Sequence, residues 1–171
     1  DSSTGIMIAA GWNRLRNSTR SLVLGPESKL YRSDDSGITW GSVNNPWGNG
    51  NRCRIGLSEH NGVFFALVVG LNMQLDNIYK STDGGINWSP IISDTSPLSN
   101  ALGGFGWYFS KIRVNPWNSE DITLLGVDAW NSLDGGVTWA LLTPVWWEYS
   151  VHADKHDLQW VGPNSAILAT D

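Results

Sequence analysis

The chain has 171 residues, of which 41% are hydrophobic and 16% are charged, and its formal net charge is −5. Length and composition are those of one globular domain and exclude a disordered chain. The lysines and arginines are scattered, which argues against a nucleic-acid partner, and no apolar run approaches the ~18 residues of a membrane span.

The first third of the chain predicts three short strands and a polar insertion. Residues 5–11 (GIMIAAG) form an apolar run typical of a strand, and a polar insertion at 12–27 separates this run from a strand at 28–33. Another strand is expected at 39–43. The stretch NNPWGNGN, at 44–51, consists of turn-forming residues and marks the end of a structural unit.

The middle of the chain also predicts three strands, and the first of them has no counterpart in the first third. Strands are predicted at 52–58, 63–69 and 88–92. Cys53 lies in the first of them and is the single cysteine, so it cannot form an intrachain disulfide and its role stays open. A loop rich in Ser, Thr, Pro and Gly follows at 93–106.

The last part of the chain predicts four more strands. Two are expected at 107–118 and 122–127. An aromatic loop, PVWWEY, occupies 144–149. It leads to strands at 151–162 and 165–170.

A ten-residue pattern occurs three times, as YRSDDSGITW at 31–40, YKSTDGGINW at 79–88 and WNSLDGGVTW at 130–139. The copies share the pattern S-x-D-x-G-x-(T/N)-W, and their serines are separated by 81 − 33 = 48 and 132 − 81 = 51 residues. A repeat at this period is typical of propellers and solenoids. The shared aspartate, glycine and tryptophan positions are Asp35, Gly37 and Trp40, then Asp83, Gly85 and Trp88, then Asp134, Gly136 and Trp139.

Each copy has the chemistry of a tight hairpin turn. The shared glycine suits a position with positive φ, and the aspartate can accept hydrogen bonds from turn amides. The tryptophan is expected to fold beneath the hairpin and to be buried. Catalysis and calcium binding are the alternatives for the aspartates. A structural role is favoured because every copy carries its own glycine and tryptophan as one unit.

This motif resembles the Asp-box, or bacterial neuraminidase repeat, of sialidases, sortilin-type receptors and xyloglucanases. The resemblance implies an all-β fold, a β-propeller of four-stranded antiparallel blades that each carry one Asp-box hairpin. On that pattern the chain begins and ends on second strands and holds three boxes and about half a blade more. Propellers close with about four to eight blades, so all of 1–171 is expected to be part of one larger propeller domain.

The most unusual polar group is the trio His152, Asp154 and His156. Alternation along a strand places all three on one face, where they form a polar network, a ligand or metal site, or a catalytic site. Three ligands on one strand span about 13 Å, too far for one ion, so a network is favoured. No metal and no cofactor are expected.

Tryptophans in loops are candidates for binding. Trp107 enters a predicted strand, and Trp146 and Trp147 lie with Tyr149 in the aromatic loop. Exposed aromatic platforms suit sugar rings or a protein partner, and the alternative is that these side chains cap blade edges. We expect Trp146, Trp147 and Tyr149 to form a contact feature at the rim.

A complete active site is not recognisable. Hydrolysis of a glycosidic bond needs two carboxylates about 5 to 10 Å apart, and no pair is marked by its spacing. The arginines fall in no sialidase motif. The carboxylate candidates are Glu59, Asp128, Glu148, Asp154 and Asp171, and the arginines are Arg14, Arg16, Arg52, Arg54 and Arg113.

Two segments sharpen the functional expectation. GWYFSKIRVNPWN resembles the inner-strand signature of sortilin-like bacterial surface propellers, and VHADKHDLQW resembles the HADxH segment of large secreted Asp-box propellers. Both segments lie within 102–171. The resemblance implies a secreted or cell-surface propeller that binds or scaffolds protein or glycan, with the remaining blades or another protein as partner. The alternative is a glycoside hydrolase of sialidase or xyloglucanase type whose site is completed by other blades. A third hypothesis is an assembly factor like the photosystem-associated propellers.

Overall fold

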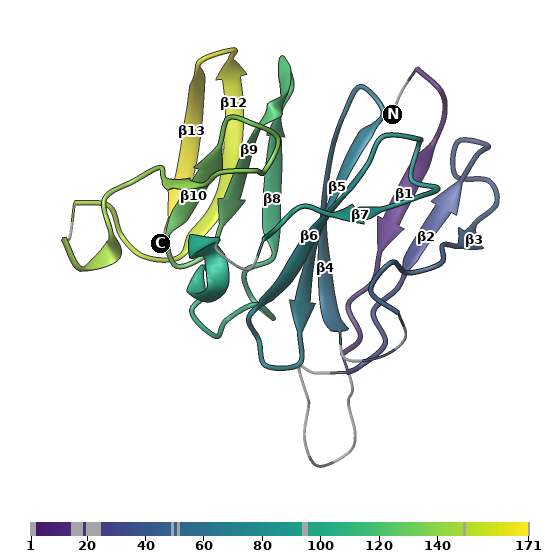
Figure 1. Ribbon diagram of the computed structural model, residues 1–171, viewed down its shortest axis with the longest axis horizontal. Coiled ribbons are helices and arrows are strands. Elements are labelled where there is room, and N and C mark those ends of the chain that lie inside the picture. The colour runs from purple at the N-terminus through teal and green to yellow at the C-terminus, as the bar shows by residue number, and fades with distance from the viewer. Residues whose placement is uncertain are drawn as a thin grey trace.

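A computed structural model describes residues 3–14, 19, 25–48, 50, 52–93, 96–148 and 150–170, with Trp146 described by its backbone alone. Arg16, Tyr149 and Asp171 lie outside the described residues. The described residues form four antiparallel sheets that follow one another in chain order across the molecule (Figure 1). The expected all-β propeller architecture, with four-stranded antiparallel blades, is confirmed.

The sheets are referred to as the first to fourth sheet. The first contains β1 (Met7–Ala10), β2 (Leu30–Ser33) and β3 (Gly41–Ser42). The second contains β4 (Arg52–His60), β5 (Val63–Gly70), β6 (Leu75–Ser81) and β7 (Ser89–Pro90). The third contains β8 (Lys111–Asn115), β9 (Asn118–Leu125), β10 (Ala129–Ser132) and β11 (Ala140–Leu141). The fourth contains β12 (Lys155–Gly162) and β13 (Ser165–Thr170), and two short 3₁₀ helices, η1 (Pro97–Asn100) and η2 (Trp146–Glu148), lie in loops.

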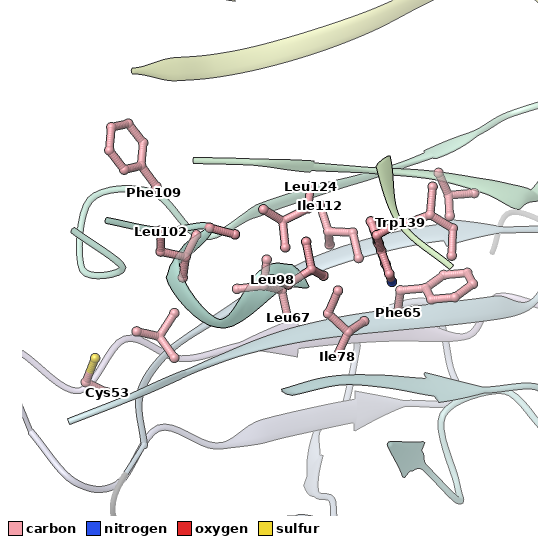
Figure 2. Close-up of a cluster of buried hydrophobic side chains, with 14 residues drawn as sticks. Cys53, Phe65, Leu67, Ile78, Leu98, Leu102, Phe109, Ile112, Leu124 and Trp139 are labelled. Carbon is pink, nitrogen blue, oxygen red and sulfur yellow. The ribbon is translucent and has the colours of Figure 1, made fainter. Parts of the chain in front are cut away.

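The main apolar core fills the space between the second and third sheets (Figure 2). Strand β5 shows how the sequence builds it, since successive side chains of a strand point to opposite faces. Phe65 and Leu67 pack in this core, whereas Phe64 and Ala66 pack in a second core against the first sheet. Both faces of β5 are therefore buried, which explains its unbroken apolar run.

Polar contacts fix neighbouring sheets relative to one another. The Val114 amide of β8 donates to Ser58 Oγ of β4 at 2.9 Å. Arg113 of β8 binds Asp157 of β12, with Nη2 2.7 Å from Oδ1. Arg32 Nε donates to the Gly84 carbonyl at 2.6 Å, which ties the first sheet to the second box.

The three box turns are built alike. In the second box, Ser81 Oγ donates to Asp83 Oδ1 at 2.8 Å, the Gly85 amide donates to Ser81 Oγ at 2.9 Å, and Trp88 Nε1 donates to the Gly85 carbonyl at 3.0 Å. The glycine has a φ of 80°. Equivalent bonds join the first and third boxes. The expected hydrogen bonds from the turn to the aspartates are thus present in every copy.

The prediction that all three box tryptophans are buried is wrong for one of them. Trp88 and Trp139 are 8% and 9% exposed, but Trp40 is 43% exposed. Trp88 packs in the core shared with the first sheet, and Trp139 in the core shared with the second. Each box tryptophan therefore needs the preceding sheet as a partner, and the described residues hold no sheet before β1.

Candidate functional site

The candidate site is built on the aromatic segment 105–109, between η1 and β8. Gly106 anchors it, because its amide donates to the Met73 carbonyl at 2.9 Å and a Cβ there would lie 2.6 Å from that oxygen. Arg54 of β4 donates from Nη1 to the carbonyls of Trp107 and Tyr108, the latter at 3.1 Å. The second sheet thus holds the backbone of the segment while leaving its side chains to project.

Four aromatic side chains of this segment line a cavity of about 250 Å³ together with Asp154. We call it the aromatic cavity. Phe109 is buried at its base, whereas Phe105 is 52% and Tyr108 47% exposed at its rim. The remaining aromatic wall is Trp107. Exposed aromatic rings around a cavity are typical of binding sites rather than of a packed core.

The rings meet at steep angles. Tyr108 and Phe109 have centroids 5.2 Å apart with planes at 68°, and Phe105 and Phe109 have centroids 6.4 Å apart at 77°. Trp107 lies 5.4 Å from Tyr108 at 51°. His156 of β12 packs against the same rings, 5.3 Å from Tyr108 at 85°. The cavity therefore has walls in several directions rather than one flat face.

The trio of His152, Asp154 and His156 does not share one strand face, which corrects that prediction. Strand β12 begins only at Lys155, so the first two residues precede it. Asp154 has a φ of 69° and its amide donates to the Val127 carbonyl at 3.2 Å. This left-handed conformation turns the chain and brings the Asp154 side chain to the aromatic cavity.

Lys155 is the buried polar residue of this region and was not singled out from the sequence. Its side chain is fully buried, and Nζ donates to the carbonyl of Val127 at 3.3 Å and to that of His152. Burial lowers the pKa of this amine, while the carboxylates of Asp128 and Asp154 act in the opposite direction. Lys155 thus fastens the turn that carries Asp154.

Of the six candidate binding residues, the structure brings three together. Trp107 and Asp154 line the aromatic cavity and His156 packs beside it. His152 is exposed, with Nδ1 2.9 Å from its neighbour's carbonyl. Trp147 is exposed on η2, away from the cavity lining, and Trp146 lies on the same helix. Phe105, Tyr108 and Phe109 were missed, although the aromatic density of FGWYF was visible in the sequence.

Most of the arginines and carboxylates considered as candidates for hydrolysis make contacts outside the aromatic cavity. Arg52 pairs with Asp76 at 2.8 Å. Glu59 accepts a hydrogen bond from the Gly62 amide at 2.8 Å in the turn after β4. Arg14 lies over the Trp12 ring, 5.2 Å from its centroid. Among the side chains that line the aromatic cavity, Asp154 is the one carboxylate.

Within the described residues, no group of three or more His, Cys, Asp or Glu side chains is arranged to hold a metal ion. None of the helices in the described ranges has the length and apolar character needed to cross a membrane.

Comparison with known proteins supports the repeat assignment. The family described as BNR/Asp-box repeat matches residues 79–90, which include the second box. A comparison with curated proteins finds no match.

Solved structures share the fold. YCF48 bound to a D1 peptide is 16% identical, with a TM-score of 0.55 over 80% of this chain and 38% of that one. The GH74 xyloglucanase from Xanthomonas campestris is 18% identical, with a TM-score of 0.55 over 82% and 22%. The GH74 enzyme from Niastella koreensis is 18% identical, with a TM-score of 0.53 over 85% and 22%.

The chain thus spans only 22% to 38% of the length of these proteins. At this level of identity the likeness concerns the fold alone. The three box hairpins, the antiparallel sheets and the shared fold agree with one another. The chain is therefore a stretch of a β-propeller built from BNR/Asp-box repeats.

Proposed function

We propose that this chain is part of a secreted or cell-surface propeller that binds a protein or a glycan through the aromatic cavity. The observation that carries the proposal is the convergence of Trp107, Tyr108 and Asp154 around one open cavity. These residues come from two segments about 45 residues apart that the second and third sheets hold in place. Aromatic rings give large contact areas at a low cost in conformational entropy.

Binding is favoured over hydrolysis at this cavity. Glycosidases place two carboxylates across the scissile bond, whereas Asp154 is the one carboxylate in the described lining. Both uses occur on this fold, since one structural neighbour is YCF48 bound to a D1 peptide and another is a xyloglucanase. A hydrolytic site, as the alternative function, would have to lie in another part of the propeller.

The remaining blades are the proposed partner of a second surface, a groove of about 430 Å³ between the third and fourth sheets. The repeats indicate its occupant. The glycines of the third box hairpin lie against the second sheet. A Cβ on Gly135 would lie 3.3 Å from Nζ of Lys80, the residue before the second box serine, and a Cβ on Gly136 would lie 2.4 Å from Cδ1 of Ile91. The equivalent residues of the third sheet are Asn131 and Leu142, and both line the groove.

We therefore propose that the groove takes a further Asp-box hairpin, one that extends the fourth sheet. The hairpin would pair with β13 and place its tryptophan against the third sheet, as Trp88 and Trp139 do with the sheets that precede them. Trp160, Leu158 and Leu168 supply apolar walls for that tryptophan. The burial of such a side chain contributes roughly 1.5–3 kcal/mol or more.

The binding proposal is tested with Trp107→Ala in the full-length protein, screened against arrays of oligosaccharides and peptides. Removal of the ring is expected to abolish binding of whichever ligand the wild-type protein retains, because the ring forms one wall of the cavity. Trp117→Ala is the matched control, since this exposed tryptophan in the turn between β8 and β9 lies outside the cavity lining.

Two outcomes would contradict the proposal. One is full retention of binding by Trp107→Ala. The other is release of sugar fragments from a bound oligosaccharide by the wild-type protein, with loss of this release in Asp154→Asn, which would make the cavity an active site.

A further inference from the structure

The chemistry of the aromatic cavity points to a particular kind of ligand. This inference rests on the proposed binding function and concerns which group the cavity accepts. A sugar ring stacks on one flat aromatic face and needs several hydrogen-bonding partners around it. The rings of Phe105, Tyr108 and Phe109 instead meet at 68° and 77°. Walls at such angles surround a compact group from several sides.

A cation is attracted to aromatic faces by the ring quadrupole, and tryptophan gives the strongest attraction. The cavity offers the Trp107 and Tyr108 rings together with two phenylalanines and one carboxylate, that of Asp154. Several aromatic faces around one site are the arrangement that binds alkylated ammonium groups. The carboxylate adds an attraction for positive charge that an uncharged ligand does not use.

The charged side chains near Asp154 do not cancel the attraction of the cavity for a cation. The carboxylates of Asp128 and Asp154 both attract the Lys155 amine, so carboxylates outnumber amines in this group of three side chains. The Lys155 amine is fully buried and donates to two carbonyls, which directs its charge into the protein. The whole chain carries a net charge of −5, which also favours a basic partner over an anionic surface.

Arg54 also lies near the segment, but its positive charge is directed away from the cavity. Its Nη1 donates to the backbone carbonyls of Trp107 and Tyr108 rather than to their rings. Its guanidinium also lies 4.9 Å from the centre of the Trp12 ring. The positive charge of Arg54 is therefore engaged by carbonyl oxygens and by a ring that does not line the cavity.

The size of the cavity suits a single side chain. Its volume of about 250 Å³ lies below the roughly 300–1,000 Å³ that is usual for drug-sized ligands. A lysine side chain reaches such a site on a flexible stem and presents a compact charge at its end. We propose that the aromatic cavity binds a lysine side chain of a protein partner, in its amine or its methylated form.

Matched small ligands test this with the full-length protein. The first is Nα-acetyl-trimethyl-lysine methylamide, and the second is its neutral isostere, in which carbon replaces the side-chain nitrogen. Isothermal titration calorimetry is expected to give an affinity for the cation about tenfold higher than for the isostere, because the two differ only in charge. This comparison uses the wild-type protein and depends on no variant.

Variants then assign the binding to the cavity. Trp107→Ala is expected to weaken binding of the cation about tenfold, and Asp154→Asn roughly threefold. Tyr108→Leu keeps an apolar side chain at an exposed position, and it should lower the affinity for the cation while leaving thermal unfolding unchanged. Trp117→Ala is the control and should bind as the wild type does.

The outcomes separate this inference from the proposed function. Equal affinities for the cation and the isostere would show an apolar site and overturn the inference. Binding of an oligosaccharide that Trp107→Ala abolishes, without binding of the cation, would overturn the inference but support the binding function. Retention of all ligand binding by Trp107→Ala would overturn both.

Discussion

At the scale of single residues, the box aspartates act as acceptors inside their own turns. In each copy the residue four positions later donates to the carboxylate, as the Asn87 amide does to Asp83 Oδ1 at 2.9 Å. Hydrogen bonds from Thr39, Asn87 and Thr138 lower the pKa of these aspartates from 3.8 to about 2. The ionised form is therefore the one that the folded turn prefers.

This preference predicts an acid-labile fold. A carboxyl group whose pKa is lower in the folded state contributes stability above its unfolded pKa, and the contribution is lost as the pH falls through the folded pKa. The free energy of unfolding is thus expected to fall between pH 3.8 and about 2. Asp83→Asn should unfold more easily at pH 7 and show a weaker pH dependence in this window. Denaturant titrations at each pH measure both, and an unchanged slope would contradict the assigned hydrogen bonds.

The buried box tryptophans predict a large loss of stability on truncation. Trp139 is 9% exposed and packs with Phe65 and Ile112 in the main core. Trp139→Ala is expected to cost about 3–5 kcal/mol, because it removes a large buried side chain and leaves a cavity. Trp117→Ala, at an exposed site, should change stability by less than about 0.5 kcal/mol. Equal effects of the two substitutions in chemical denaturation would contradict the assigned packing.

At the scale of elements, the sequence was most informative where turn residues and apolar runs mark a hairpin. The run 63–69 became β5, Val63–Gly70, because both of its faces are buried. The starts of β8 and β12 were predicted too early. In both cases the preceding residues look extended but bond to loops, as the Tyr108 amide does to the Phe105 carbonyl. The alternation of apolar and polar residues does not reveal at which residue a strand begins to pair with its neighbour.

The candidate site was predictable from residue type but not from the arrangement of the chain. Trp107 and Asp154 were singled out by residue type, and the cavity brings them together. Their proximity depends on the packing of two distant segments and on the positive φ of Asp154. A non-glycine residue gives little sequence signal for that conformation. His152 was expected beside them, but it lies before β12 and is exposed.

At the scale of the whole molecule, neighbouring blades are joined by contacts that recur at equivalent positions. The box hairpin of the second sheet reaches the first sheet through Arg32, and that of the third reaches the second through Lys80, the residue equivalent to Arg32, and through Ile91. The groove lined by Asn131 and Leu142 offers the third sheet's version of this contact. The residues that line the aromatic cavity take no part in these repeated contacts, so we expect the cavity to stay open when further blades are added.

A crystal structure of the full-length protein tests the account most directly. The account predicts an Asp-box hairpin in the groove, with its glycine against Leu142, and an aromatic cavity that remains open to solvent. Both features follow from the repeated contacts and from the exposed rings of Phe105 and Tyr108. An aromatic cavity filled by another blade of the same chain, or a groove left without a box hairpin, would contradict it.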